Sequence, residues 1–317
     1  MEKRQLGDSQ LYVKPIAFGG NVFGWTIDEK QSFKMLDAFV EADFDFIDTA
    51  DTYSWWVEGN SGGESESIIG KWSAERKNRD KIILSTKVGS QNKDRPKNIS
   101  RSFILKSVED SLRRLRTDYI DLYQTHFDDE VTPVEETLSA YQQLIKEGKV
   151  RVIGTSNMSP NRILQSLKAS ADNDLPKYQT LQPQYSLVER ATYEQELRPI
   201  VEQNNMGVLN YYSLASGFLT GKYRSKEDLG KSPRGAGVEK YLNDSGFRIL
   251  NALDAISRKH SSSPATISLA WLLARPTITS PIVSATSLKQ LQSIIDAPKI
   301  HLDKHDMDQL NNASDFR

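Results

Sequence analysis

Short apolar runs alternate with amphipathic segments along nearly the whole chain. The apolar runs begin near residues 16, 44, 82, 119, 150, 180, 207 and 282, and polar residues follow each of them. Runs of this kind are typical of buried strands in a parallel sheet. Most of them are separated by stretches in which apolar residues recur at helical spacing, as at Phe33, Leu36 and Phe39. The pattern therefore predicts eight β–α units.

Eight such units in one chain fit a closed (β/α)₈ barrel of the TIM type better than an open sheet. Ahead of them, residues 4–13 predict a β-hairpin with turn residues at Gly7-Asp8-Ser9, and this hairpin would plug the amino-terminal end of the barrel. Residues 214–246 are rich in Gly, Ser and Lys and are predicted to be a mobile loop. Extra helices are expected near the C-terminus, at about 303–314, and we expect one domain over residues 1–317.

Composition excludes several kinds of protein. The chain has 41 Lys and Arg against 42 Asp and Glu, so it lacks the positive charge typical of nucleic-acid binding. It has no cysteine, which excludes disulfides and a cysteine nucleophile. No apolar run approaches the length of a membrane span, and residues 1–5 lack the apolar core of a signal peptide. We therefore expect a cytoplasmic protein that binds neither nucleic acid nor membrane.

Polar side chains stand where three of the predicted strands end. Asp48 ends the strand near 44 and Tyr53 follows five residues later, while Lys87 and His126 end the next two strands. In α/β barrels this edge is where ligands bind. The alternatives are ordinary ones: Asp48 and Asp51 cap a turn, Lys87 lies on the surface, and His126 is a core histidine. A closed barrel would bring Asp48, Tyr53, Lys87 and His126 together, which favours a functional role for these four residues.

Such a group can transfer a proton. A tyrosine hydroxyl has a pKa of about 10, and a nearby ammonium lowers it by favouring the phenolate. A carboxylate paired with the lysine keeps the lysine charged, and a histidine can orient a substrate oxygen. Reduction of a carbonyl by hydride needs this combination of an acid and hydrogen-bond donors at the oxygen. His301 and His305 have the spacing of a metal-binding pair but no third ligand nearby, so no metal site is expected.

Four segments resemble those of the aldo-keto reductase superfamily, and the resemblance covers the whole chain. The segments are residues 48–53, 85–89, 118–126 and 148–157. The resemblance implies that Tyr53 is the general acid, that Lys87 and Asp48 tune it, and that His126 orients the substrate. It also implies an NAD(P)H-dependent oxidoreductase that binds its cofactor without a Rossmann domain.

The resemblance further assigns residues to the cofactor. Ser156, Asn157 and Gln182 would hold the nicotinamide carboxamide, and Tyr212 would stack on the nicotinamide ring. The remaining positions that match the cofactor-binding pattern are Gly20, Asn21, Asp48, Ser213, Leu214, Ser216, Gly217, Lys222, Ser284, Thr286 and Gln290. The substrate would contact Tyr53, His126 and the loop tryptophans Trp55 and Trp56; the alternative for these tryptophans is packing in the core.

Three positions depart from the family pattern. Ser54 stands where glycine is usual and is followed by the Trp55-Trp56 insertion. Ser284 replaces a lysine that many members place on the 2′-phosphate, and Ile294 replaces an asparagine near the adenine. NADP is the cofactor expected from the family pattern, and NAD stays possible.

We therefore predict an enzyme that reduces an aldehyde, ketone or sugar carbonyl, or oxidises the alcohol. The aromatic loop and the lack of obvious charged substrate clamps favour a neutral or partly apolar small-molecule substrate. An alternative is a cofactor-binding sensor or partner protein, as potassium-channel β subunits are. The physiological substrate, the favoured direction and the oligomeric state stay open.

Overall fold

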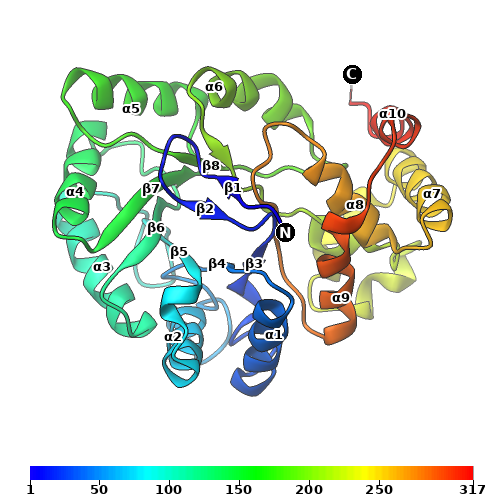
Figure 1. The fold of residues 1–317 in the computed structure, drawn as a ribbon, viewed down its shortest axis with the longest axis horizontal. Helices are drawn as coiled ribbons and strands as arrows, with labels where there is room; N and C mark the ends of the chain where they lie inside the picture. The colour runs from blue at the N-terminus through cyan, green and yellow to red at the C-terminus, as the bar shows by residue number, and fades with distance from the viewer. Residues whose placement is uncertain (317) are drawn as a thin grey trace.

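The computed structural model describes residues 1–316 and contains an eight-stranded parallel sheet curled into a barrel (Figure 1). The strands are β3 (Ala17–Gly19), β4 (Phe46–Asp48), β5 (Ile83–Val88), β6 (Ile120–Thr125), β7 (Val150–Ser156), β8 (Thr180–Gln182), β9 (Gly207–Val208) and β10 (Ile282–Val283). They pair in the order β10-β3-β4-β5-β6-β7-β8-β9. The backbone N–H of Ile282 also donates to the Asn210 carbonyl at 2.9 Å, which links the two ends of the sheet. The predicted eight-stranded barrel is thus confirmed.

Helices surround the strands, and most lie where the spacing of apolar residues predicts them (Figure 1). They are α1 (Glu29–Glu41), α2 (Glu64–Arg76), α3 (Arg101–Leu115), α4 (Val134–Lys146), α5 (Pro160–Asp172), α6 (Arg198–Gln203), α7 (Asp244–Lys259), α8 (Pro264–Leu273), α9 (Leu288–Asp296) and α10 (Lys304–Ala313). Side-chain caps fix several starts: Asp28 accepts from the N–H of Gln31, and Ser159 from that of Arg162. A π-helical turn, Tyr193–Leu197, lies directly ahead of α6.

The N-terminal hairpin lies across the amino-terminal end of the barrel, as predicted (Figure 1). Its strands are β1 (Arg4–Gln5) and β2 (Tyr12–Val13). Its apolar residues pack against inward-facing strand residues in one cluster: Leu6, Leu11, Val13, Ala17, Phe46, Leu122, Val152, Leu209 and Ile282. The Arg4 guanidinium also donates to the carbonyls of Ile278 and Leu273, at 2.9 and 3.2 Å. The hairpin therefore covers the amino-terminal end, and the opposite end, where the strands terminate, is the one at which barrels of this type bind ligands.

The prediction of a mobile loop over 214–246 is wrong in one respect, because this segment has secondary structure. It contains three 3₁₀-helical stretches, η4 (Ala215–Thr220), η5 (Lys226–Lys231) and η6 (Gly235–Tyr241). Phe218, Leu219, Tyr223 and Val238 are fully buried and attach the segment to the core. These apolar residues are too widely spaced to produce a periodic signal in the sequence.

Within residues 1–316, no helix is long and apolar enough to cross a bilayer.

Candidate active site

Lys87 is the centre of a buried hydrogen-bonded group at the carboxyl ends of the strands. It is fully buried near the end of β5, and its Nζ contacts Asp48 Oδ2 at 2.6 Å, the Thr49 carbonyl at 2.7 Å and the Tyr53 hydroxyl at 2.9 Å. A lysine ammonium has three hydrogens to donate, so this set of acceptors satisfies it. The amine is thereby fixed between a carboxylate and a phenol.

Asp48 is held by further donors from neighbouring strands. Its Oδ1 accepts from the Ser85 hydroxyl and from Gln182 Nε2, each at 3.1 Å, and from Gln124 Nε2 at 3.4 Å. Ser85 and Gln124 were not predicted to belong to the site. The sequence does carry a signal for Ser85, since it lies two residues from Lys87 and side chains two apart on a strand share a face. The Asp48 carboxylate is therefore both buried and fixed in orientation.

The charge states of the group follow from burial and from Lys87. Desolvation raises the pKa of Tyr53 above its usual value, although the Lys87 ammonium opposes the rise. The expectation of a lowered tyrosine pKa is thus wrong for the protein alone, because desolvation outweighs the lysine. Burial by itself lowers the pKa of Lys87, but Asp48 and Tyr53 reverse this and raise it. Tyr53 is therefore a neutral phenol beside a charged lysine at neutral pH.

His126 lies at the end of β6, with its ring centroid 5.9 Å from that of Tyr53. Burial and the nearby Lys87 charge lower its pKa well below the usual value, so the imidazole is neutral at neutral pH. Its Nδ1 is buried and has no hydrogen-bond partner within residues 1–316. The structure thus brings together all four predicted residues: Asp48, Tyr53, Lys87 and His126.

Three tryptophans, Trp25, Trp55 and Trp56, form a cluster that we call the tryptophan wall, and Trp56 connects it to Tyr53. The ring centroid of Trp56 is 6.3 Å from Tyr53, 5.5 Å from Trp25 and 6.5 Å from Trp55. Trp56 is 41% exposed, so it is not a core residue. Trp25 comes from the glycine-rich segment after β3 and was not predicted to belong to the site. The wall forms an apolar surface next to the Tyr53 ring.

Ser54 and Asn60 attach the loop of this wall to the segment that carries Trp25. The Ser54 hydroxyl donates to the Phe23 carbonyl at 2.7 Å, and Asn60 Nδ2 donates to the Gly24 carbonyl at 3.0 Å. Ser54 has φ +73°, a left-handed conformation that explains why glycine is usual at this position in the resembling family. The serine accepts this strain and supplies a hydrogen bond that glycine cannot make.

Two substitutions separate these effects at Ser54. We expect Ser54→Ala to lower the free energy of unfolding by about 1 kcal/mol, because the hydrogen bond to the Phe23 carbonyl is lost while the left-handed strain remains. We expect Ser54→Gly to be nearly neutral, since relief of about 1 kcal/mol of strain offsets the lost bond. Urea unfolding of both variants measures the difference, and equal stabilities would contradict this account.

Two cations without carboxylate partners flank the loop that follows β9. The Arg234 guanidinium is partly buried, lies 5.1 Å from the ring centroid of Trp25, and donates to Asn21 Oδ1 at 3.3 Å. Lys222 Nζ lies beside Gly217, 3.4 Å from the position of an added Cβ there. Within residues 1–316, neither cation forms an ion pair with a carboxylate. Burial lowers the pKa of Arg234, because removing a charge from water without a counter-ion is unfavourable.

The backbone that precedes Lys222 is unusual. Ala215, Ser216 and Gly217 have successive positive φ values of +48°, +57° and +94°, and Tyr212 has φ +55°. Left-handed non-glycine residues cost free energy and cluster at ligand sites. At Gly20, an added Cβ would lie 2.8 Å from Ser65 Oγ, so only glycine fits there. The arrangement of a strained turn, a glycine and two unpaired cations suits an extended anionic ligand.

The other residues assigned to the cofactor have varied surroundings. The Ser156 hydroxyl donates to the Gln182 carbonyl at 2.8 Å, and Ser284 Oγ donates to Asn21 Oδ1 at 2.8 Å. Ser213 is turned inward, because its hydroxyl donates to the Ile282 carbonyl at 2.8 Å, which leaves only its backbone for a ligand. Leu214 is partly buried against the core, and the Thr286 hydroxyl donates to Gln290 Oε1 at 3.0 Å. Tyr212 is 48% exposed, which leaves its ring accessible.

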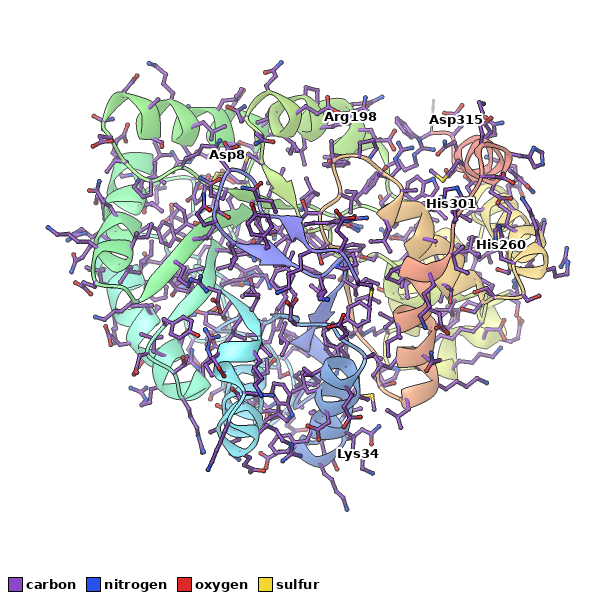
Figure 2. All side chains as sticks on the ribbon, in the orientation of Figure 1. Asp8, Lys34, Arg198, His260, His301 and Asp315 are labelled. Atoms are coloured by element: carbon purple, nitrogen blue, oxygen red, sulfur yellow. The ribbon has the colours of Figure 1, made fainter. Side chains whose placement is uncertain are left out.

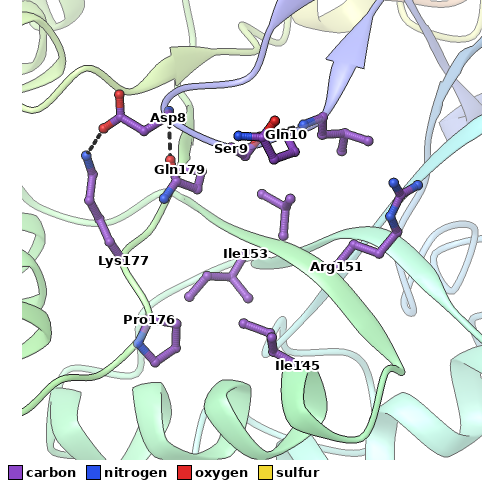
Figure 3. A pocket seen from close by; sticks show the side chains of 11 residues that line it. Asp8, Ser9, Gln10, Ile145, Arg151, Ile153, Pro176, Lys177 and Gln179 are labelled. Atoms are coloured by element: carbon purple, nitrogen blue, oxygen red, sulfur yellow. Dashed lines mark hydrogen bonds and ion pairs between the residues drawn. The ribbon is translucent and has the colours of Figure 1, made fainter.

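Two cavities lie outside this group. One of about 370 Å³ is at the hairpin end of the barrel, between Ser9, Ile145, Arg151 and Lys177, and is remote from Lys87 (Figure 3). The other, of about 270 Å³, lies behind Asn157 and Tyr211. Within residues 1–316, no three His, Asp or Glu side chains gather as a metal site would require. Figure 2 shows His301 beside the C-terminal helices, away from the strand ends.

Comparison with known proteins agrees with this geometry. Residues 15–315 match the model of the Aldo/keto reductase family. The chain is 35% identical to the Uncharacterized oxidoreductase YrpG of Bacillus subtilis (strain 168), over 98% of this chain and 95% of that protein. It is 32% identical to the Aldo-keto reductase YhdN of the same organism, over 98% and 93%. It is also 32% identical to a probable voltage-gated potassium channel subunit beta of Oryza sativa subsp. japonica, over 92% and 89%.

The chain belongs to the aldo/keto reductase family. The resemblance drawn from four sequence segments is thereby confirmed over nearly the whole length. Relatives in this family are named oxidoreductases and reductases, which supports an oxidoreductase here.

Proposed function

We propose that this protein is an NAD(P)H-dependent reductase of an aldehyde, ketone or sugar carbonyl, or catalyses the reverse oxidation. The observation that carries the proposal is the contact of Lys87 Nζ with both Asp48 and Tyr53, at 2.6 and 2.9 Å. A buried lysine between a carboxylate and a phenol serves to stabilise the phenolate that remains after proton donation. Simple packing needs no such charge pair, since buried ions are costly.

Tyr53 donates the proton in this mechanism. Because Lys87 already donates to the phenol oxygen, the hydroxyl hydrogen of Tyr53 is free to point at a substrate oxygen. The neutral imidazole of His126 holds that oxygen by a hydrogen bond, and the tryptophan wall keeps water away from it. When the proton leaves Tyr53, the Lys87 ammonium becomes the counter-ion of the phenolate, while Asp48 keeps Lys87 charged.

The residues around the strained turn and the two cations fit a nicotinamide dinucleotide. Bound there, the nicotinamide supplies or accepts the hydride. Ser156, Asn157 and Gln182 would hold its carboxamide and Tyr212 would cover one ring face. The strained turn at Ser216-Gly217 and the unpaired cations Lys222 and Arg234 would hold the phosphates. We propose NADP as the preferred form, since Arg234 adds a cation to a site in which Ser284 replaces the lysine that many family members have.

Removal of Arg234 tests the phosphate assignment. We expect Arg234→Met to raise the Kd of NADPH by about 10- to 100-fold, because a charge-assisted hydrogen bond contributes about 1.5–3 kcal/mol. The salt dependence of binding should weaken in the same variant. Tryptophan fluorescence titration at two salt concentrations measures both effects, with Arg248→Met on the surface of α7 as the control. An unchanged Kd in Arg234→Met would remove this residue from the phosphate site.

The competing proposal is a cofactor-binding sensor or partner protein. It is favoured by the similarity to probable potassium channel subunits, such as that of Oryza sativa subsp. japonica. Titration of NADPH and NADH by tryptophan quenching, followed by absorbance loss with a panel of aldehydes, separates the two. Absence of binding to both nucleotides would overturn the reductase proposal, and binding without turnover on any carbonyl would favour the sensor.

A further inference from the structure

Tyr211 touches two of the groups assigned above to the nicotinamide. Its hydroxyl donates to Asn157 Oδ1 at 2.8 Å. Its ring lies against Tyr212, with centroids 5.3 Å apart and planes at 61°. Tyr212 has φ +55° and Asn157 has φ +46°, so both neighbours are held in left-handed conformations. Residues kept in such conformations need surrounding contacts that over-determine them.

The amide of Asn157 has only one orientation that satisfies its neighbours. Its Nδ2 lies 2.9 Å from the His126 carbonyl and 3.0 Å from Ser156 Oγ. A backbone carbonyl can only accept, so the amide nitrogen must face His126 and the amide oxygen must face Tyr211. Both amide hydrogens are then used inside the protein. The oxygen keeps one lone pair, which can accept an N–H of a ligand.

Packing alone does not fix this amide. Asn157 and Tyr211 both line the cavity of about 270 Å³, together with Met158, Leu181 and Gln184. The empty volume leaves space for the Asn157 side chain to turn once its hydrogen bond is removed. Burial raises the pKa of Tyr211 to about 12, so its hydroxyl stays a donor throughout the neutral range. The hydrogen bond from Tyr211 is thus the contact made by the amide oxygen, and it adds to the two bonds that hold the amide nitrogen.

We propose that Tyr211 is a positioning residue that orients the Asn157 carboxamide toward the nicotinamide amide and supports Tyr212 behind the ring. This inference rests on the proposed function. Tyr211 acts through two other residues and does not itself touch the reacting atoms. It gives the cofactor's carboxamide a preformed acceptor on one side and the cofactor's ring a fixed surface on the other.

The variant Tyr211→Phe keeps the ring and removes the hydroxyl. We expect it to raise the Kd of the reduced nucleotide about fivefold, the effect of one hydrogen bond, and to lower kcat while KM for the carbonyl changes little. The control is Tyr193→Phe, which removes a 2.6 Å bond to Thr277 Oγ1 in another part of the barrel and should leave Kd and kcat unchanged. Circular dichroism and thermal unfolding check that both variants fold.

A double-mutant cycle with Asn157→Ala tests the route of the effect. If Tyr211 acts through Asn157, Tyr211→Phe should have little further effect on Kd in the Asn157→Ala background. Additive effects, or a Kd and kcat equal to wild type in Tyr211→Phe, would overturn the positioning role while the reductase proposal stands. If the wild-type protein binds neither NADPH nor NADH, the proposed function and this inference both fail.

Discussion

Tyr53→Phe is expected to lower kcat by about 10²- to 10⁴-fold, the usual contribution of a positioned general acid. The nucleotide Kd should change little, because the phenol oxygen is bonded to Lys87 and is assigned to the substrate and not to the nucleotide phosphates. Steady-state reduction of an aldehyde and a separate fluorescence titration measure the two quantities. Wild-type turnover in this variant would show that the proton comes from another group.

The pH profile of the wild-type enzyme carries a related expectation. Tyr53 must be protonated to act as the acid in reduction, and desolvation raises its pKa above the usual value. The alkaline loss of kcat for reduction should therefore begin above the pH at which an exposed tyrosine ionises. His126, with its lowered pKa, stays neutral through the same range and should add no titration near neutral pH. A loss of activity centred near pH 7 would contradict both assignments.

Lys87→Met is expected to abolish turnover and to lower the free energy of unfolding by about 3–5 kcal/mol, since it leaves a buried carboxylate without its partner. Asp48 is 1% exposed, so water cannot replace the lost ammonium. Urea unfolding gives the stability change. The doubly substituted Asp48→Asn, Lys87→Met protein should regain part of the stability but none of the activity.

The matched control is Lys71→Met on α2. Lys71 forms a 2.7 Å ion pair with Glu29, but the two side chains are 43% and 47% exposed. Exposed pairs of this kind contribute about 0–1 kcal/mol, so the variant should unfold almost as the wild type does. If Lys87→Met were as stable as Lys71→Met, the buried Lys87–Asp48 pair would contribute no more to the free energy of unfolding than an exposed pair does.

The sequence predicted the barrel and the catalytic group because both depend on local patterns. Each strand is an apolar run, and Asp48, Lys87 and His126 stand at the ends of successive runs. In a parallel barrel the ends of neighbouring strands must meet, so adjacency follows once the topology is assigned. The Lys87–Asp48 contact follows from strand order, whereas Tyr53 lies in the turn after β4.

The other groups could not be found in this way. Trp25, Arg234 and Tyr211 lie on segments between strands, and their neighbours are set by the course of those segments in space. Arg234 is 213 residues from Asn21, its hydrogen-bond acceptor. The sign of the Tyr53 pKa shift was also beyond sequence reasoning, because it depends on how much desolvation opposes the lysine.

The attachment of the tryptophan wall bears on how this protein can evolve. Ser54 and Asn60 donate to the main-chain carbonyls of Phe23 and Gly24, and not to side chains. Every residue has such a carbonyl, so substitutions in the segment that carries Trp25 can be accepted without loss of these two hydrogen bonds. The acid–lysine pair is built separately, on strand ends. Selection can therefore alter the shape of the tryptophan wall in small steps while the Lys87–Tyr53 pair is inherited intact.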